Sequence, residues 1–571
     1  MRFNSRPSSL VWALAVAIAL GGCASLTRTG DAERHIELQI LAINDFHGNL
    51  ETPRNDLGGA AYLAAHLRRA EAEAVHSVIV SAGDLIGATP LISSLFHDEP
   101  TIEFANMLGL DYNGVGNHEF DEGKEELLRM QHGGPHPVDG ESPGGPFRGA
   151  EFRFLAANVI DVQTGRTLLP PYAIRRFDGV PVAFIGLTLE DTPAVASAAA
   201  VAGLSFMDEV ETIHSLVGQI RKQGVEAIVV IIHQGGFQSD GGEDDCNDFR
   251  GPIVDIVKKA HPAVDLFVSG HTHRHYLCRV NGRPVTSTGT AGRFYTDISA
   301  RLDRTSGDLV VLDFDNVPVT QDISPAADVE ALISRYRSLV ETVSGEVVGA
   351  ITGDFTKDQD SAGQSALGGL IADAQLAATQ YEGEGGADVA FMNPGGIRSN
   401  LLYPATDSEQ DGEVTYAEVF SVHPFGNHLV TMTLSGAQVL RLLEQQWANP
   451  PARTMMTPSA GFSYAWRRSV EKEGTDLIKS VPKLSSRVDP SSVRVNGQPL
   501  EPTRDYRVTV NSFLAEGGDG FTVFAEGTDR VDGAADVDAL QDYLELNSPL
   551  SPAELDRIRV VGSDSGGDRF N

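Results

Sequence analysis

The chain has 571 residues and a formal net charge of −34 at pH 7, and 41% of its residues are hydrophobic. A chain of this length exceeds what one hydrophobic core usually organises, so we expect two sizeable domains. The acidic excess argues against a nucleic-acid partner, whose backbone requires clustered lysines and arginines, but it leaves small phosphorylated ligands open because cations and a few arginines can form a local positive site.

Residues 1–22 are typical of an export signal. Arg2 and Arg6 precede an apolar stretch at residues 10–20, which is too short for a stable membrane span. The sequence Leu20-Gly21-Gly22-Cys23 resembles a bacterial lipobox, which implies cleavage before Cys23 and lipid attachment to its sulfur. The alternative is an ordinary signal peptide with an incidental cysteine.

A lipid on Cys23 would be the only membrane attachment that we expect, with residues 23–35 as a polar tether. The protein would then be exported and anchored at the periplasmic side of the cell envelope. Ala24, rather than an aspartate, follows the cysteine, and by the sorting rules of lipoproteins this favours the outer membrane.

Residues 36–322 are predicted to form an α/β domain, because apolar β-branched runs alternate with helix-like segments. The expected strands are 38–43, 78–81, 227–232 and 266–269, and the expected helices include 59–74 and 210–223. Residues 131–149, rich in glycine, proline and histidine, interrupt this pattern and are predicted to be a surface loop. We expect His132 and His136 to be solvent-exposed rather than metal ligands.

The rest of the chain is predicted to form a second α/β domain. Residues 323–344 carry apolar residues at helical spacing and are expected to form a linker helix, which is a candidate hinge. The second domain would span residues 345–561, with strands at 388–392, 428–434 and 506–511. Residues 562–571 form a polar tail, and the chain has no internal repeat.

Cys246 and Cys278 flank the sequence that contains His271 and His273. In an oxidising compartment they could form a disulfide bond. The alternative is two free, partly buried thiols, because a sequence does not establish the geometry that a disulfide requires.

Five short blocks in the first domain supply side chains that can bind metal ions. They are Asn44-Asp45-Phe46-His47-Gly48, Gly83-Asp84, Gly116-Asn117-His118-Glu119, His233 and Gly270-His271-Thr272-His273. Four of the five follow a predicted buried strand, and sites in open α/β sheets form beyond the carboxyl ends of the strands. Ligands spread over more than 200 residues could therefore meet in one pocket.

The donor set favours transition metals. Carboxylate, amide and imidazole donors together suit Zn, Mn, Fe or Co better than Ca or Mg, and the lack of a cysteine argues against a structural zinc site. Asp45 and His47 are two residues apart, so they can reach the same ion. Asp84 is placed to bridge two ions, and Asn117 offers an amide oxygen.

These blocks match, in order, those of the calcineurin-like metallophosphoesterases, and the chain resembles that superfamily. The resemblance implies a four-layer αββα domain with two divalent ions, for which Mn, Zn and Co are the first candidates. It assigns one ion to Asp45, His47, Asp84 and His273, and the other to Asp84, Asn117, His233 and His271. His275 falls outside the pattern and is expected not to bind metal.

His118 and Asp121 are the candidate catalytic residues. Two ions can orient and acidify a water molecule for in-line attack on a phosphoryl group. His118 is then free to stabilise the transition state or to protonate the leaving oxygen, and Asp121 can orient its imidazole. The resemblance implies the same pair. The alternative for Asp121 is that it caps a helix.

Three segments of the second domain carry substrate information: residues 391–398, 422–427 and 511–521. Arg398 follows glycines at the end of a strand and can bind phosphate through its planar guanidinium. Phe425 and Phe513 lie in loops, where two rings could sandwich a planar base at about 1–3 kcal/mol per contact. The alternative is that each ring packs against its own domain.

These segments resemble the C-terminal domain of 5′-nucleotidases. The resemblance implies that Phe425 and Phe513 form the stacking pair and that Asn393, Arg398 and Asp519 make polar contacts with the substrate. Pro394 stands where the family often has glycine. Residues 354–369 lack an arginine that relatives often carry, and Lys357 or Arg453 could compensate for it.

The sequence therefore predicts a two-metal phosphohydrolase that releases phosphate from nucleoside 5′-monophosphates, with 2′,3′-cyclic nucleotides as further candidates. An alternative keeps the metal chemistry but changes the substrate to a sugar phosphate, a nucleotide-sugar pyrophosphate or a sulfur ester. A third hypothesis is a non-catalytic surface receptor. Both a monomer and a dimer remain open.

Overall fold

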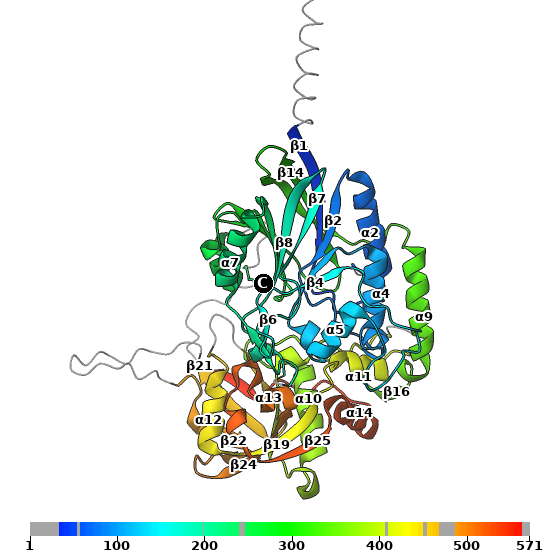
Figure 1. The fold of residues 1–571 in the computed structure, drawn as a ribbon. Helices are drawn as coiled ribbons and strands as arrows, with labels where there is room; N and C mark the ends of the chain where they lie inside the picture. Colours follow the sequence, from blue (N-terminus) through cyan, green and yellow to red (C-terminus); the bar gives the residue numbers. More distant parts are fainter. Residues whose placement is uncertain are drawn as a thin grey trace, which may run out of the picture.

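The computed structural model describes residues 34–53, 57–197, 199–238, 246–405, 409–448, 454–467 and 486–561. Two α/β parts lie end to end, and helix α9 (Ala327–Ser344) runs along one side of the first part (Figure 1). The predicted export signal, Cys23 and the tail at residues 562–571 lie outside the described residues. None of the described helices combines the length and the apolar character needed to cross a bilayer.

The first part contains two six-stranded sheets. The strands of one sheet follow the order β15 (Leu309–Pro318), β14 (Phe294–Asp303), β1 (His35–Ile43), β2 (Ser77–Ser81), β3 (Tyr112–Gly114) and β4 (Arg153–Leu155). The strands of the other follow the order β12 (His275–Val280), β13 (Arg283–Thr288), β11 (Leu266–Ser269), β10 (Ala227–His233), β8 (Val180–Thr188) and β7 (Tyr172–Phe177).

The alternation of side chains along the strands explains why the sheets stack. In β1, Leu38 and Ile40 face a core shared with Phe184 of the other sheet, whereas Leu41 faces the opposite way. Helices cover the two outer faces: α2 (Ala60–Glu73) and α4 (Glu99–Leu108) on one, and α7 (Glu209–Arg221) and α8 (Pro252–Lys259) on the other. This arrangement confirms the predicted four-layer αββα architecture.

Helix α5 (Lys124–His132) ends at the start of the predicted surface loop. Residues 133–149 contain no helix or strand beyond an isolated bridge between His136 and Gly140, which confirms a loop. His132 is exposed as expected. The expectation for His136 is wrong: only 13% of its side chain is exposed, because its ring stacks on His97.

Cys246 and Cys278 form a disulfide bond, which settles the two alternatives left open by the sequence. It joins the 3₁₀ helix η2 (Cys246–Asp248) to β12, beside the turn that carries His271 and His273. Both cysteines also pack with the core beneath α7 and α8, where an apolar disulfide needs no polar partner.

The second part is built on a five-stranded sheet with the order β20 (Thr457–Pro458), β17 (Val389–Met392), β24 (Asp505–Asn511), β19 (His428–Ser435) and β25 (Thr528–Ala535). Helices α10 (Ala366–Thr379) and α14 (Asp536–Asn547) pack together in one core. Helix α12 (Gly436–Gln445) and the short α13 (Ser512–Ala515) contribute to another. The three predicted strands in this part are confirmed to within one residue at each end.

A smaller, four-stranded sheet completes the second part. Its order is β23 (Gln498–Pro499), β22 (Arg494–Val495), β21 (Phe462–Arg467) and β26 (Ile558–Val561). Phe462, Tyr464 and Trp466 of β21 point into the same core as α12.

Helix α9 lies within the range predicted for a linker helix, and it contacts both parts of the molecule. It packs against α2, α3 (Leu91–Ser94) and α4 of the first part and against α11 (Tyr416–Val422) of the second. Tyr336 of α9 is buried and donates a hydrogen bond to Glu103 of α4, with an O···O distance of 2.9 Å. Because α11 leads directly into Phe425, α9 and α3 hold the start of that loop next to the first part.

Candidate metal centre

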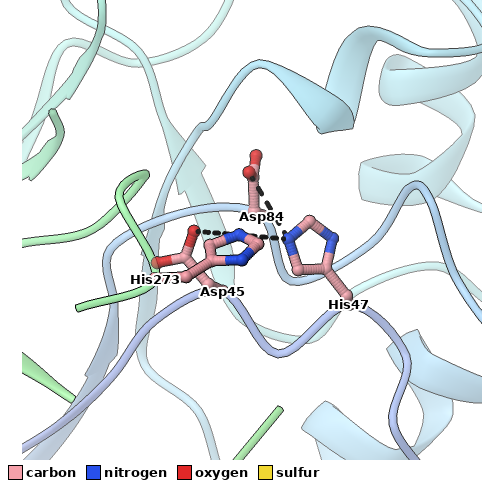
Figure 2. Close-up of side chains that lie close together, drawn as sticks. All are labelled: Asp45, His47, Asp84 and His273. Carbon is pink, nitrogen blue, oxygen red and sulfur yellow. Dashed lines mark hydrogen bonds and ion pairs between the residues drawn. The ribbon is translucent and has the colours of Figure 1, made fainter. Parts of the chain in front are cut away.

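Asp45, His47, Asp84 and His273 form one cluster, in which the possible ligand atoms all lie within 4.8 Å of one another (Figure 2). His47 Nε2 lies 3.2 Å from His273 Nε2. His273 Nε2 lies 3.4 Å from Asp45 Oδ1. These are the four residues that the sequence assigns to a first ion.

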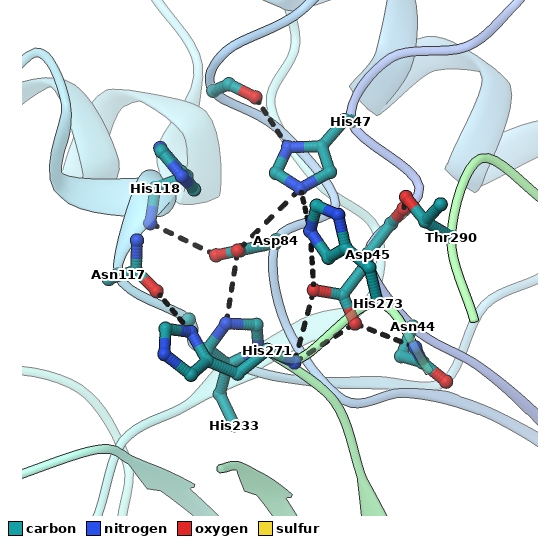
Figure 3. A network of polar contacts seen from close by, with 12 residues as sticks. Asn44, Asp45, His47, Asp84, Asn117, His118, His233, His271, His273 and Thr290 are labelled. Carbon is teal, nitrogen blue, oxygen red and sulfur yellow. Dashed lines mark hydrogen bonds and ion pairs between the residues drawn. The ribbon is translucent and has the colours of Figure 1, made fainter. Parts of the chain in front are cut away.

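A second cluster contains Asp84, His233 and His271. His233 Nε2 lies 3.0 Å from Asp84 Oδ2, and Asn117 Oδ1 lies 3.0 Å from His271 Nδ1. Figure 3 shows Asp84 between the two clusters, with His47 on one side and His233 on the other. The structure therefore brings all seven predicted ligands together and places Asp84 where one carboxylate can serve two ions.

The strand order explains this convergence. β1 and β2 are parallel neighbours in one sheet, and β10 and β11 are parallel neighbours in the other, so their carboxyl ends meet at one edge of the stacked sheets. Asp45 and His47 follow β1, Asp84 follows β2, and His233 ends β10. Asn117 follows β3, a three-residue strand that was not among the predicted ones.

Five of the seven candidate ligands have a left-handed backbone. The φ angles are +48° at Asp45, +47° at His47, +49° at Asp84, +72° at His271 and +53° at His273. Residues other than glycine adopt this region rarely, and such outliers gather at functional sites. Backbone hydrogen bonds from Asp45 N to Gly83 O and from His47 N to Asp84 O join the two turns and hold them in this conformation.

Glu119 is a buried acceptor to which the sequence analysis assigned no role. Its carboxylate accepts hydrogen bonds from Asp84 N, Leu85 N, Gly116 N and Asn113 Nδ2, at distances of 2.7–3.0 Å. Burial, and then the charge of Asp84, raise the pKa of Glu119 to about 7. The sequence signal for a role of Glu119 was its position directly after His118 in the third block. Its contacts show that it fixes the turn that carries Asp84.

Two of the histidines direct Nε2 atoms to the centre. His47 Nδ1 lies 2.8 Å from Gly87 O and His233 Nδ1 lies 2.7 Å from Ala82 O, so each Nδ1–H donates to a carbonyl and Nε2 is the nitrogen available to a metal ion. His233 Nε2 is buried and faces Asp84 Oδ2 at 3.0 Å. A buried nitrogen that faces another candidate ligand atom fits a metal ligand.

Electrostatics agree with this assignment. Burial, together with His233, lowers the pKa of His271 to about 4, which keeps the ring neutral. For His233, burial lowers the pKa, but the nearby Asp84 carboxylate outweighs it and raises the pKa to about 10. The carboxylates therefore favour positive charge in the space between these side chains, and bound divalent cations would supply that charge.

His118 and Asp121 form the predicted pair beside the clusters. His118 Nδ1 lies 2.9 Å from Asp121 Oδ2, and the backbone N–H of His118 donates to Asp84 Oδ1 at 3.0 Å. Burial lowers the pKa of His118, but Asp121 and Asp84 outweigh it and the net pKa is raised. The first residue before α5 is Gly123, so Asp121 does not cap that helix, and its side chain is engaged by His118.

Arg398 reaches across from the second part to the metal clusters. Its Nη2 lies 3.2 Å from His47 Nε2, and its guanidinium carbon lies 5.6 Å from the centroid of the Phe425 ring. The Phe425 ring in turn stacks on His118, with centroids 5.7 Å apart. Two of the predicted substrate residues therefore lie directly beside the candidate catalytic histidine and the first metal cluster.

The other three predicted substrate residues lie in the second part. Asn393 Nδ2 donates to Asp519 Oδ2 at 2.7 Å, and Asn511 Nδ2 donates to Asn393 Oδ1 at 3.1 Å. The Phe513 ring packs over Gly518, where a Cβ would collide with it. The turn η6 (Gly518–Gly520) touches α6 (Thr192–Val195) of the first part. The pairing of Phe513 with Phe425 around a base stays a prediction.

Lys357, one of the two residues that could compensate for the missing arginine, contacts the segment that carries Arg398. Its Nζ donates to Arg398 O at 2.9 Å, and its backbone N–H donates to Asn400 Oδ1 at 2.9 Å. Burial, and then the charge of Arg398, lower the pKa of Lys357. Arg453 lies outside the described residues. Pro394 begins the short 3₁₀ helix η4 (Pro394–Gly396), just before Arg398.

A cavity of about 260 Å³ opens beside His118 and Asp121. Its walls include these two residues and Glu122 from the first part, and Phe420, Pro424 and Phe425 from the second. The cavity beside His118 is thus lined by residues of both parts.

Two family models match the chain. Residues 38–275 match the calcineurin-like phosphoesterases, and residues 347–526 match the 5′-nucleotidase C-terminal domain. The chain therefore belongs to the family that joins a calcineurin-like phosphoesterase domain to a 5′-nucleotidase C-terminal domain, as its sequence motifs imply.

Curated relatives extend over nearly all of this chain. "Endonuclease YhcR" of Bacillus subtilis is 30% identical over 544 residues, which cover 93% of this chain but only 41% of that protein. "Cell wall protein Lmo0130" of Listeria monocytogenes is 31% identical over 563 residues, which cover 92% of this chain and 69% of that protein. The chain thus spans less than half of the first relative and about two thirds of the second.

Among solved structures, a 5′-nucleotidase precursor from Thermus thermophilus superposes with a TM-score of 0.72 at 26% sequence identity. The match covers 92% of this chain and all of that one. Both parts of the molecule are included in the superposition, so the two-part architecture is shared.

Proposed function

We propose that this protein is a metal-dependent phosphohydrolase that releases phosphate from nucleoside 5′-monophosphates. The observation that carries the proposal is the position of Arg398. It projects from a 5′-nucleotidase-type domain to within 3.2 Å of His47, at two ligand clusters that share Asp84. With divalent ions held by the clusters, a phosphate bound to Arg398 would meet positive charge on both sides.

Bound divalent ions, for which the donor set favours Mn, Zn or Co, would supply the Lewis-acid chemistry that polarises a phosphoryl group and acidifies a water molecule. The protein's own residues complete the reaction. His118 can deliver a proton to the leaving 5′ oxygen, and Asp121 holds the imidazole in the tautomer and orientation that this transfer requires.

Phe425, Phe513, Asn393 and Asp519 would bind the nucleoside. Phe425 lies in a loop of the second part, whereas Phe513 lies in the short helix α13 and not in a loop as expected, and both residues are only partly buried. Asn393 and Asp519, joined by a hydrogen bond, offer a donor and an acceptor within the same loop system. The name of the solved relative, a 5′-nucleotidase precursor, supports this substrate class.

We further propose domain boundaries at 36–322, 323–344 and 345–561, with α9 as a hinge. Support comes from the separate hydrophobic cores of the two parts. Arg398 closes over His47, so a substrate would enter when the parts separate. Small-angle scattering should report a more compact particle with a saturating adenosine analogue than without it, and identical profiles would contradict the hinge.

Export and lipid attachment at Cys23 are the remaining parts of the proposal. The Cys246–Cys278 disulfide supports an oxidising compartment, and one relative is named a cell wall protein. Mass spectrometry of the mature N-terminus should show a lipid-modified cysteine, and Cys23→Ser should move the protein from the detergent phase to the aqueous phase. An unmodified N-terminus at another residue would reject the anchor.

A phosphate-release panel tests the function. The purified protein would be loaded in turn with Mn²⁺, Zn²⁺ and Co²⁺ and given nucleoside 5′-monophosphates, 2′,3′-cyclic nucleotides, a nucleotide sugar, ribose 5-phosphate and a DNA oligonucleotide. We expect the highest kcat/KM for 5′-monophosphates. A preference for the nucleotide sugar would favour the alternative substrate class, and cleavage of the oligonucleotide alone would favour an endonuclease.

A further inference from the structure

A second group of metal-binding side chains lies away from the seven ligands of the centre. His97 belongs to the turn between α3 and α4, Glu122 to the turn between His118 and α5, and His136 and Asp139 to the loop at residues 133–149. One ligand atom from each of His97, Glu122 and His136 lies within 4.8 Å of the others. Three separate segments of the chain thus meet here.

The two imidazoles are stacked, with ring centroids 3.7 Å apart and planes at 13°. Along one edge, Glu122 Oε2 lies 2.8 Å from His97 Nδ1 and 3.9 Å from His136 Nε2. Along the opposite edge, Asp139 Oδ2 lies 2.9 Å from His97 Nε2 and 3.4 Å from His136 Nδ1. Each ring therefore has one nitrogen directed to Glu122 and the other to Asp139.

His97 has the arrangement of a metal ligand with its supporting carboxylate. Histidines that bind a metal ion through one ring nitrogen usually donate the other N–H to a carboxylate or carbonyl, which fixes the tautomer. The Asp139 carboxylate can accept from His97 Nε2 in this way, and the Asp139 backbone N–H donates to His136 Nδ1 at 3.2 Å. A cation on the Glu122 edge would therefore displace the proton that His136 carries on Nε2.

We propose that His97, His136 and Glu122 bind a divalent transition-metal cation, with Asp139 orienting the two imidazoles. Two imidazole nitrogens and a carboxylate oxygen form a donor set that suits Zn²⁺. Bonds of about 2.0–2.1 Å to a tetrahedral ion place neighbouring ligand atoms about 3.3 Å apart. The two Glu122 distances, 2.8 and 3.9 Å, bracket that separation, and the stacked rings would rotate out of parallel so that both nitrogens face one ion.

The surroundings hold His97 in place. Its φ angle is +49°, and that of Asp98 is +60°. The buried Asp98 carboxylate accepts hydrogen bonds from Gly87 N at 2.9 Å, Thr89 Oγ1 at 2.5 Å and Ser93 Oγ at 2.7 Å, which secures the turn.

A cation at this cluster would lie close to the proposed reaction site. Glu122 follows Asp121 in the sequence, and His97 and Glu122 line the same cavity as His118 and Phe425. Binding would fasten the loop at residues 133–149 and the α3–α4 turn to the segment that carries Asp121. The competing explanation is an ion-pair network in which a protonated His97 joins Glu122 and Asp139 without a metal.

Equilibrium dialysis of the full-length mature protein against Zn²⁺ separates the two explanations. We expect three equivalents in the wild type, two in the proposed centre and one in this cluster. The double variant His97→Gln/His136→Gln should hold two. His132→Gln is the matched control, because His132 lies close in sequence but is exposed, and it should hold three.

Two further measurements keep the test decisive if the double variant fails to fold. Zinc-edge anomalous scattering from a crystal grown with Zn²⁺ should give a peak between His97, His136 and Glu122. Asp139→Asn should weaken the third equivalent about 10- to 100-fold. A wild type that shows no peak at this position, or an equal number of ions in wild type and double variant, would overturn the proposal whether or not the protein hydrolyses nucleotides.

Discussion

The ring of Phe425 lies on the imidazole of His118, with centroids 5.7 Å apart and planes at 23°. A residue of the 5′-nucleotidase C-terminal domain therefore covers a candidate catalytic residue of the phosphoesterase domain. The contact excludes water from one face of His118. It also places a ring that we expect to bind the nucleobase beside the group that we expect to protonate the leaving oxygen.

Phe425→Ala should lower kcat/KM for AMP about 5- to 150-fold, which corresponds to the 1–3 kcal/mol of one base–aromatic contact. Ribose 5-phosphate carries the same ester without a base, so its kcat/KM should fall much less. Steady-state kinetics on both substrates measures the difference. An equal loss on both would mean that Phe425 acts through His118 and not through the base.

Asp121→Asn should lower kcat by up to about 100-fold, because the imidazole loses the carboxylate that orients it. The sign of the pH effect follows from the same contact. Burial lowers the pKa of His118 and Asp121 raises it. Removal of the carboxylate lowers this pKa, so the protonated acid is lost at a lower pH, and the alkaline limb of the kcat profile moves to lower pH.

The control for this variant is Glu125→Gln, because the Glu125 side chain on the neighbouring helix is 80% exposed. Its pH–rate profile should match the wild type. An Asp121→Asn variant with an unchanged alkaline limb would show that His118 is not the acid.

Asp84→Asn should remove both ions of the centre, because both clusters use this carboxylate. His273→Gln touches only the first cluster and should retain the second ion. Metal analysis after gel filtration checks the two stoichiometries. Treatment of the wild type with a chelator should abolish phosphate release, and Mn²⁺, Zn²⁺ or Co²⁺ should restore it; activity that survives full chelation would contradict a metal mechanism.

Glu119→Gln should lower the free energy of unfolding by about 1–3 kcal/mol, since the new amide NH₂ would face a backbone N–H that then has no acceptor. Chemical denaturation monitored by circular dichroism measures the change, and Glu125→Gln again serves as the exposed control. A Glu119→Gln protein as stable as the wild type would show that one oxygen suffices for these donors.

The sequence predicts the metal centre well for a definite reason. Asp84 and His233 follow apolar runs that can only be buried strands, and parallel strands deliver their following residues to one edge of a sheet. The chemistry of these side chains does not depend on the details of packing. Both the strand positions and the ligand types can therefore be predicted from a single sequence.

Other features depend on contacts between distant segments, and no local pattern reveals them. His136 lies in a polar loop and is expected at the surface, but its ring is covered by His97 from another turn. The stacking of Phe425 on His118 joins two domains. The sequence alone does not show that four N–H groups donate to the Glu119 carboxylate.

Five residues around the centre have a left-handed backbone, and each such residue costs on the order of 1 kcal/mol. Cations that bind only the native turns offset that cost by mass action. With the proposed ions, folding of the enzyme is tied to trace-metal supply: in a metal-starved medium a larger share of newly made chains should stay open to proteases, so abundance and specific activity should fall together.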